Sequence, residues 1–189
     1  MDFDLALRAL VVTFPAVEVV IAVGRRARSG IARHADQGSM RVLWLVISLS
    51  VAVAVMSQWI PGVRLPAPRG VVKGLALFML ATGLALRWVS IWSLGRFFTV
   101  DVAIHEGHRL VDRGVYRYIR HPSYTGLMMA FAGLALFFGN WVSLLVLIGP
   151  IGLALLLRIK TEETALLEGL GPPYAAYCAR TERLIPGIY

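Results

Sequence analysis

The residues best suited to chemistry are concentrated in YRYIRHPSYTG, residues 116–126, which holds two arginines, one histidine and three tyrosines. Guanidinium groups bind carboxylates and phosphates through paired hydrogen bonds, and tyrosine rings pack on flat or cationic groups. A second polar stretch, RIKTEETALLEGLGPPYAAYCARTERLIPG, covers residues 158–187. The two stretches hold most of the densely polar chemistry of the chain, so they are the candidates for a functional site.

The first polar stretch directly precedes LMMAFAGLALFFG, residues 127–139, which carries no charge. One interpretation is an interfacial belt, with tyrosine and arginine side chains at headgroup depth and Pro122 at a helix start. The other is a site that meets lipid on one edge and the cytosol on the other. Such a site suits a reaction between a water-soluble reagent and a membrane-borne substrate. The second polar stretch favours this interpretation.

The composition places these clusters in an integral membrane protein. Of the 189 residues, 58% are hydrophobic and 16% are charged, with a mean hydropathy of +0.70. Soluble domains have about 45–50% apolar and about 25% charged residues. The apolar runs lack the alternation of a membrane barrel, and open sheets do not span lipid. We therefore predict an all-α fold.

The apolar runs predict about five transmembrane helices in a single membrane domain, residues 1–189. Gly139 and Asn140 alone separate the last two, which predicts a tight helical hairpin over 123–157. Residues 1–92 supply three N-terminal spans, and residues 93–189 form a catalytic core that ends in a cytoplasmic tail. The cofactor pocket is expected between the 93–122 segment and that tail. The predicted spans are 5–23, 42–60, 74–92, 123–139 and 141–157.

The net charge of +8 follows the topology of the chain. Most basic residues lie after the first span, between the third and fourth, and in the tail. The positive-inside rule places these segments and the C-terminus in the cytoplasm, and the N-terminus outside. The basic excess then attracts anionic lipids, and we predict no nucleic-acid partner. The single cysteine, Cys178, excludes an intrachain disulfide, and the histidine spacing fits no metal motif, so no metal is predicted.

Two charged residues fall inside predicted spans at similar depth, Glu18 in the first and Arg87 in the third. An unpaired charge at that depth is unfavourable. Arg87 either extends to the headgroups, pairs with Glu18, or faces the active site.

The order of motifs in the second half resembles the isoprenylcysteine carboxyl methyltransferase family. The resemblance covers residues 83–189 and includes LGRFFTVDVAIHEGHRLVDRGVYRYIRHPSYTG, an apolar hairpin, EE, and GPPYAAYCARTERLIPG. Members of this family use S-adenosylmethionine, release S-adenosylhomocysteine, and methylate a carboxylate on a lipid-modified cysteine. The wider set includes phospholipid N-methyltransferases. The resemblance therefore implies methyl transfer to a lipophilic or prenylated acceptor held among membrane lipids.

The resemblance also implies roles for individual residues. Arg158 falls where the family has a substrate-contacting arginine, which here would hold the acceptor carboxylate. Arg120 is included in the cofactor site because arginines bind carboxylates such as that of the cofactor. The predicted cofactor-binding residues are His108, Arg109, Leu110, Val111, Tyr116, Arg120, His121, Pro122, Ser123, Tyr124 and Glu162.

The residue chemistry is consistent with these roles. Aromatic faces favour a sulfonium and an adenine, which suits Tyr116 and Tyr124. The carboxylate of Glu162 can accept hydrogen bonds from the cofactor ammonium or ribose. An acceptor carboxylate is already ionised at neutral pH, so alignment and exclusion of water are the main requirements. No glycine-rich dinucleotide fingerprint follows a strand.

Three alternatives remain open at this stage. The first is N-methylation of a phospholipid or another lipid amine. The second is an NADPH-dependent membrane reductase of the steroid 5α-reductase type. The third, a non-catalytic transporter subunit or scaffold, is disfavoured because the predicted midplane positions are almost wholly apolar. Titration with S-adenosylhomocysteine and NADPH distinguishes these classes.

Overall fold

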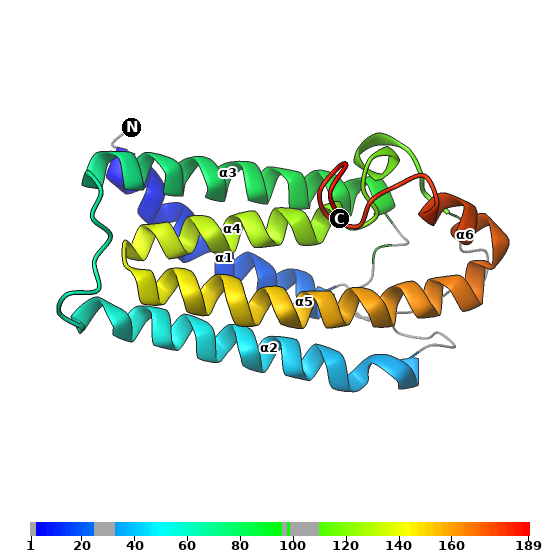
Figure 1. The fold of residues 1–189 in the computed structure, drawn as a ribbon, viewed down its shortest axis with the longest axis horizontal. Coiled ribbons are helices and arrows are strands. Elements are labelled where there is room, and N and C mark those ends of the chain that lie inside the picture. The colour runs from blue at the N-terminus through cyan, green and yellow to red at the C-terminus, as the bar shows by residue number, and fades with distance from the viewer. Residues whose placement is uncertain (1–2, 25–32, 96–97, 99–109) are drawn as a thin grey trace.

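Long helices lie at the five positions where the sequence predicts membrane-crossing segments (Figure 1). The computed structural model describes residues 3–24, 33–95, 98 and 110–189. Those ranges contain no strand, only two isolated bridges, so the all-α prediction is confirmed. The long helices are α1 (Phe3–Gly24), α2 (Arg33–Met56), α3 (Arg69–Leu94), α4 (Pro122–Phe138) and α5 (Trp141–Leu170). The short ones are η1 (Ser57–Trp59), η3 (Gly114–Arg117) and α6 (Pro172–Cys178).

Helix α5 is longer than predicted: it ends at Leu170, whereas the predicted span ends at residue 157. It stops where Gly171 adopts φ +62° and two prolines follow, a combination that ends helices. The extension matters because it carries Arg158, Glu162 and Glu163 on the same rigid element as the apolar span.

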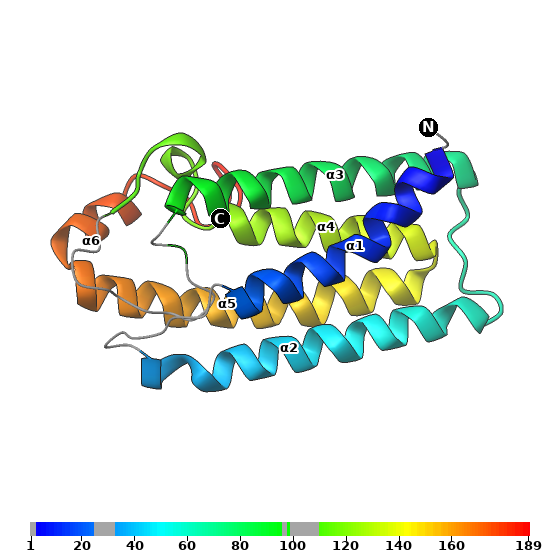
Figure 2. The same cartoon turned by 180° about the vertical axis from the view of Figure 1, so that it is seen from behind.

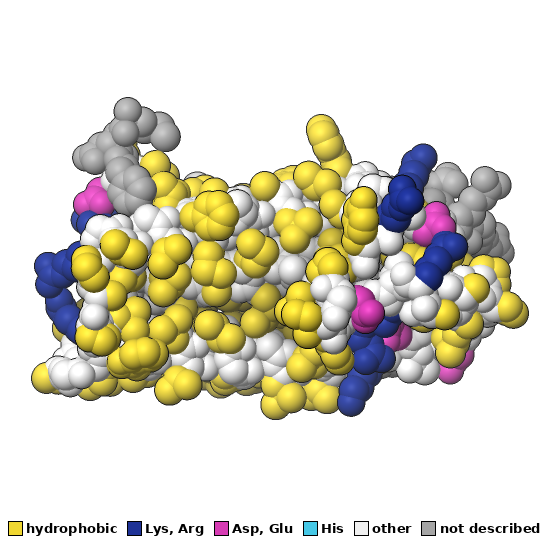
Figure 3. Space-filling view, turned by 45° about the horizontal axis from the view of Figure 1, so that its top comes forward, with side chains coloured by type: hydrophobic (Ala, Val, Ile, Leu, Met, Phe, Trp, Pro, Cys, Tyr) yellow, Lys and Arg dark blue, Asp and Glu magenta, His cyan; other side chains and the backbone are white. Residues whose placement is uncertain are grey.

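The helices have the length and surface of a multi-pass membrane protein. Three of them are long and apolar enough to cross a membrane, Gly38–Trp59, Arg69–Leu94 and Trp141–Leu170, and α4 is a shorter apolar helix. Figure 3 shows hydrophobic side chains over the middle of the visible face and charged ones toward its two ends. Exposed tryptophans lie near both ends, Trp59 and Trp141 at one and Trp88 and Trp92 at the other, as in interfacial belts.

Pairs of helices build the bundle. Helix α3 packs along α4, and α2 packs along α5. Helix α1 crosses the bundle obliquely (Figure 2), and its Phe14 ring meets the Phe131 ring of α4 edge-on, with centroids 5.3 Å apart. We call the end with α6 and the C-terminal segment 179–189 the tail end, and the opposite end the loop end.

The α3–α4 pair depends on glycines that let two backbones touch. An added Cβ on Gly133 would lie 2.7 Å from the amide nitrogen of Leu80 and 2.8 Å from the carbonyl oxygen of Ala76. One on Gly83 would lie 2.6 Å from the carbonyl oxygen of Gly126. Small residues at such crossings are typical of membrane helices, where close packing replaces the hydrophobic effect between helices.

At the loop end, the predicted hairpin between α4 and α5 is confirmed and is fixed by Asn140. Gly139 ends α4 with φ +67°, and the Asn140 side chain accepts from the Ser143 amide at 2.8 Å, capping α5. The buried Ser57 hydroxyl donates to the same Asn140 oxygen at 3.1 Å. The turn is thereby joined to the end of α2.

At the tail end, the C-terminal segment pairs with the residues that precede α4. The amides of Arg120 and His121 donate to the carbonyls of Glu182 and Arg183 at 2.8 and 2.9 Å. The Thr125 hydroxyl donates to the Leu184 carbonyl at 2.8 Å. The chain end is therefore fixed beside the start of α4.

We expect Gly133→Ala to lower the thermal unfolding midpoint in detergent, because the methyl group would force α3 and α4 apart. Overpacking of this kind destabilises by about 1–3 kcal/mol. The control is Gly74→Ala in α3, where an added Cβ meets nothing within 4 Å and a helical alanine gains about 0.5–1 kcal/mol. Equal midpoints for the two variants would contradict the proposed role of Gly83, Gly126 and Gly133, which we call the glycine seam.

Candidate active site

A cavity of about 190 Å³ lies at the tail end, enclosed by parts of every long helix and by the segments beside η3 and α6. Its lining divides into two halves. One is apolar and extends toward the middle of the bundle, and the other is polar and aromatic and lies beside α6.

The apolar half is a slot between α1, α2 and α4. Along α2 it runs from Met40 to Val51, about 16 Å at the rise of an α-helix. Along α4 it runs from Leu127 to Leu134, and Phe14 of α1 closes one side against Phe131. Such a slot matches an extended hydrocarbon chain.

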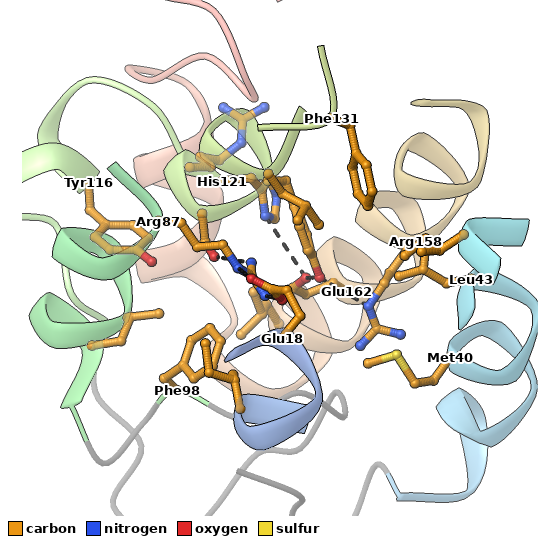
Figure 4. A pocket seen from close by; sticks show the side chains of 18 of the residues that line it. Glu18, Met40, Leu43, Arg87, Phe98, Tyr116, His121, Phe131, Arg158 and Glu162 are labelled. Carbon is orange, nitrogen blue, oxygen red and sulfur yellow. Dashed lines mark hydrogen bonds and ion pairs between the residues drawn. The ribbon is translucent and has the colours of Figure 1, made fainter. Parts of the chain in front are cut away.

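A chain of hydrogen bonds separates the two halves. The Tyr124 hydroxyl donates to the Glu162 carboxylate at 2.8 Å and accepts from Arg158 Nε at 3.0 Å. Arg158 Nη1 donates to the Ser39 hydroxyl at 3.0 Å, which ties α5 to α2. Arg158 is 2% exposed, and Figure 4 shows its guanidinium facing Met40 and Leu43, on the α2 side of Glu162.

The two charges within the N-terminal spans form an ion pair on the cavity wall. Arg87 donates to both carboxylate oxygens of Glu18, each at 2.5 Å, and its Nη1 donates to the Ser123 hydroxyl at 2.8 Å. The two side chains are 9% and 12% exposed. Of the three expectations for Arg87, the structure therefore gives pairing with Glu18 at the site, and the headgroup interpretation is wrong.

The second glutamate of the EE pair, Glu163, connects the tail to the site. Its carboxylate accepts from Arg120 Nε and Arg183 Nε, each at 2.9 Å, and lies 3.4 Å from His121 Nε2. Arg120 Nη1 also donates to the carbonyls of Cys178 and Thr181. Glu163 thereby holds the His121 ring against Tyr124, at a centroid distance of 5.6 Å.

Part of the polar half of the cavity is lined by aromatic side chains. Tyr116, Tyr174 and Tyr177 are buried and line the cavity, together with Leu110 and Val111. The Tyr177 hydroxyl donates to the Tyr116 carbonyl at 2.6 Å, which holds η3 on α6. Burial raises the pKa of Tyr177 to about 12 and also raises the pKa of Tyr116. Both phenols therefore stay neutral at physiological pH.

The structure brings most of the predicted site residues to this one cavity. Pro122 is buried at the first turn of α4 without lining the cavity, and Arg120 lines it with Nε and Nη1 bound to protein acceptors. His108 and Arg109 lie outside the described residues. The predicted residues that line the cavity are Leu110, Val111, Tyr116, Arg120, His121, Ser123, Tyr124, Arg158 and Glu162.

Sequence reasoning missed the contribution of the first two helices to the wall, and the roles of Glu163, Tyr174 and Tyr177. The pocket was expected between the 93–122 segment and the tail alone, whereas α1 and α2 also line it. The Gly-x-x-Tyr-x-x-Tyr motif held a signal for the two tyrosines. The sequence holds no comparable signal for the apolar lining from α2, because its residues have the composition of an ordinary membrane-spanning helix.

Comparison with known proteins agrees with the family resemblance found in the sequence. The sequence model of the isoprenylcysteine carboxyl methyltransferase family matches residues 75–168. Protein-S-isoprenylcysteine O-methyltransferase B of Arabidopsis thaliana is 31% identical over 119 residues, which are 62% of this chain and 60% of that protein. Protein-S-isoprenylcysteine O-methyltransferase of Schizosaccharomyces pombe is 35% identical over 115 residues, or 60% of this chain and 49% of that one.

The fold is also similar to a solved structure, that of a eukaryotic intramembrane Ras methyltransferase of the isoprenylcysteine carboxyl type. The TM-score is 0.61 at 24% identity, covering 77% of this chain and 52% of the other. This chain thus spans about half to three fifths of the length of these relatives.

The Glu18–Arg87 pair predicts an order of stabilities. Arg87→Ala leaves the carboxylate of Glu18 without its partner, and breaking a buried pair from one side destabilises by about 3–5 kcal/mol. The double variant Glu18→Ala/Arg87→Ala removes both charges, so we expect its unfolding midpoint in detergent to lie above that of Arg87→Ala. A double variant no more stable than Arg87→Ala would show that the pair is not coupled.

Proposed function

Since the chain belongs to the isoprenylcysteine carboxyl methyltransferase family, we propose that it methylates the carboxylate of a lipophilic, isoprenylcysteine-like acceptor with S-adenosylmethionine. The observation that carries the proposal is the division of one cavity into an apolar slot and a polar aromatic half. The two halves meet at Tyr124, Arg158 and Glu162. A lipid chain and a charged nucleoside can therefore reach the same point from opposite sides.

The polar half has groups that fit S-adenosylmethionine. When bound, this cofactor supplies an electrophilic methyl group on a sulfonium. The rings of Tyr116 and Tyr124 offer aromatic faces to its cationic and flat parts. The carboxylate of Glu162 offers an acceptor for its ammonium or ribose hydroxyls, with Leu110 and Val111 as apolar contacts.

Arg158 is suited to hold the acceptor carboxylate. Its bonds to Tyr124 and Ser39 fix the guanidinium where the slot meets the polar half, beside Met40 and Leu43 (Figure 4). A buried guanidinium attracts a carboxylate and disfavours an amine acceptor, which becomes cationic on methylation. This favours O-methylation over N-methylation.

The chain needs no general base for this reaction. A carboxylate is ionised at neutral pH, so its oxygen is nucleophilic without loss of a proton. The contribution of the protein is then orientation and exclusion of water. The slot excludes water around the acceptor, and burial raises the pKa values of Tyr116 and Tyr177, so both phenols stay neutral.

We place the tail end, with the site, in the cytoplasm and the N-terminus outside. Basic residues of the tail end include Arg113, Arg117 and Arg180, while the connection to α3 at the loop end offers Arg64 and Arg69. The excess at the tail end satisfies the positive-inside rule. This orientation exposes the polar half to cytosolic cofactor.

Calorimetric titration of the purified protein tests the cofactor assignment. S-adenosylhomocysteine is expected to bind with one site per chain, and NADPH is expected not to bind. Binding of NADPH without binding of S-adenosylhomocysteine would overturn the proposal in favour of a reductase.

Substitutions at Arg158 and Glu162 should affect the kinetics of different substrates, the acceptor for Arg158 and the cofactor for Glu162. Glu162→Ala should raise the KM for S-adenosylmethionine, because a cofactor hydrogen bond to a charged group is lost, worth about 1.5–3 kcal/mol. Arg158→Ala should lower kcat/KM for a farnesylcysteine acceptor while the affinity for S-adenosylhomocysteine changes little. Steady-state kinetics with each substrate varied in turn measures both effects.

A matched control separates these roles from helix stability. Lys160→Ala lies on the same stretch of α5, is exposed and does not line the cavity, so its kinetics should equal those of the wild type. Wild-type turnover by Arg158→Ala would contradict the assignment of that arginine.

The slot predicts a dependence on acceptor chain length. Ile47 of α2 lines the slot, so Ile47→Trp should shorten it and reduce kcat/KM for a farnesylated acceptor more than for a geranylated one. Leu45→Trp places the same bulk on the exposed face of α2 and serves as control. A uniform reduction for both acceptors would place the lipid chain elsewhere.

A further inference from the structure

The hydroxyl of Tyr174 stands out among the buried polar groups. Tyr174 is 3% exposed and lines the cavity, and its oxygen has no hydrogen-bond partner. Within the described part of the chain, it is the one buried side-chain nitrogen or oxygen in this condition. Buried polar groups are normally hydrogen-bonded, because an unsatisfied one destabilises the fold. An unsatisfied hydroxyl in a cavity wall indicates a ligand that bonds to it.

The local structure fixes this hydroxyl in place. Gly171 and the following prolines start α6, and the Tyr174 amide donates to the Gly171 carbonyl at 3.0 Å. The Tyr174 ring packs on Tyr177, with centroids 6.0 Å apart. The two tyrosines lie three residues apart on one helix face, yet only the Tyr177 hydroxyl is used within the protein, where it donates to Tyr116.

The surroundings of Tyr174 identify the chemistry of that ligand. The Tyr177 ring packs on Tyr174, and the same cavity is lined by the apolar or aromatic Leu166, Leu170 and Tyr116. The charged groups Glu162, Glu163 and Arg120 act on Tyr174 electrostatically, but they are bonded to other partners, Glu162 to Tyr124 and Glu163 to Arg120. A flat base with polar edges and a ribose fits the aromatic end. Burial raises the pKa of Tyr174, so its hydroxyl is a neutral donor at physiological pH.

We propose that Tyr174 binds the nucleoside part of S-adenosylmethionine through its hydroxyl, an assignment that rests on the proposed function. Tyr174 would be a specificity-determining residue at the cofactor end of the site. It selects for a nucleoside and makes no contact with the acceptor.

Tyr174→Phe tests the assignment because it removes one oxygen and keeps the ring. Calorimetry should give an affinity about three- to tenfold weaker for S-adenosylhomocysteine, the range of one hydrogen bond. Methylthioadenosine, which has the nucleoside and no amino-acid part, should lose the same factor. In the absence of ligand, the unfolding midpoint of Tyr174→Phe should equal or exceed that of the wild type, since no bond within the protein is lost.

Tyr177→Phe is the matched control. It removes the donor to the Tyr116 carbonyl and should therefore lower the midpoint in the absence of ligand. Wild-type affinity of Tyr174→Phe for both ligands would overturn the assignment of Tyr174 and leave the proposed function intact. A loss for S-adenosylhomocysteine without a loss for methylthioadenosine would overturn the nucleoside assignment. Failure of the wild-type protein to bind S-adenosylhomocysteine would overturn the proposed function and this assignment with it.

Discussion

A charge held away from water in a membrane protein needs a partner, and the tail end of this bundle is organised by that constraint. Glu18 and Arg87 join α1 to α3, and Ser123 extends the pair to α4. Arg158 joins α5 to α2 through Ser39 and to α4 through Tyr124. Glu163 joins α5 to the segment before α4 and to the C-terminal tail. Each group of contacts connects elements that are distant in the sequence.

The cavity lies beside the closely packed α3–α4 pair and is lined mainly by α1, α2, α4 and α5. Along the glycine seam the two backbones touch, so no space remains between those helices. At the tail end, the Glu18–Arg87 pair and the bonds of Arg158 to Ser39 and Tyr124 connect the helices around the cavity. The same side chains give the cavity its polar wall, while α2 and α4 give it an apolar one. In the proposed function, a lipid chain and a polar nucleoside share this cavity.

Much of this arrangement could be predicted from the sequence, because apolar run length determines where membrane helices lie. The hairpin at Gly139 and Asn140 was predictable for the same reason, and the ordered motifs indicated the residues around His121 and Glu162. The partners of charged groups were harder to predict. Arg87 had three possible positions until tertiary packing brought α1 beside it. Glu163 and Tyr174 lacked assigned roles, because a sequence does not show which of two adjacent acids faces a cavity, or which of two tyrosine hydroxyls is bonded within the protein.

The central claim is that one cavity brings a lipid-linked carboxylate to the methyl group of S-adenosylmethionine. The most direct measurement is methyl transfer from cofactor labelled in its methyl group to an N-acetylated farnesylcysteine in detergent, followed by mild alkaline treatment of the product. A carboxyl methyl ester hydrolyses under alkali, so the account predicts that the label enters the acceptor and is then released as methanol. Label that stays on the acceptor through alkaline treatment, or no transfer by a protein that binds S-adenosylhomocysteine, would contradict it.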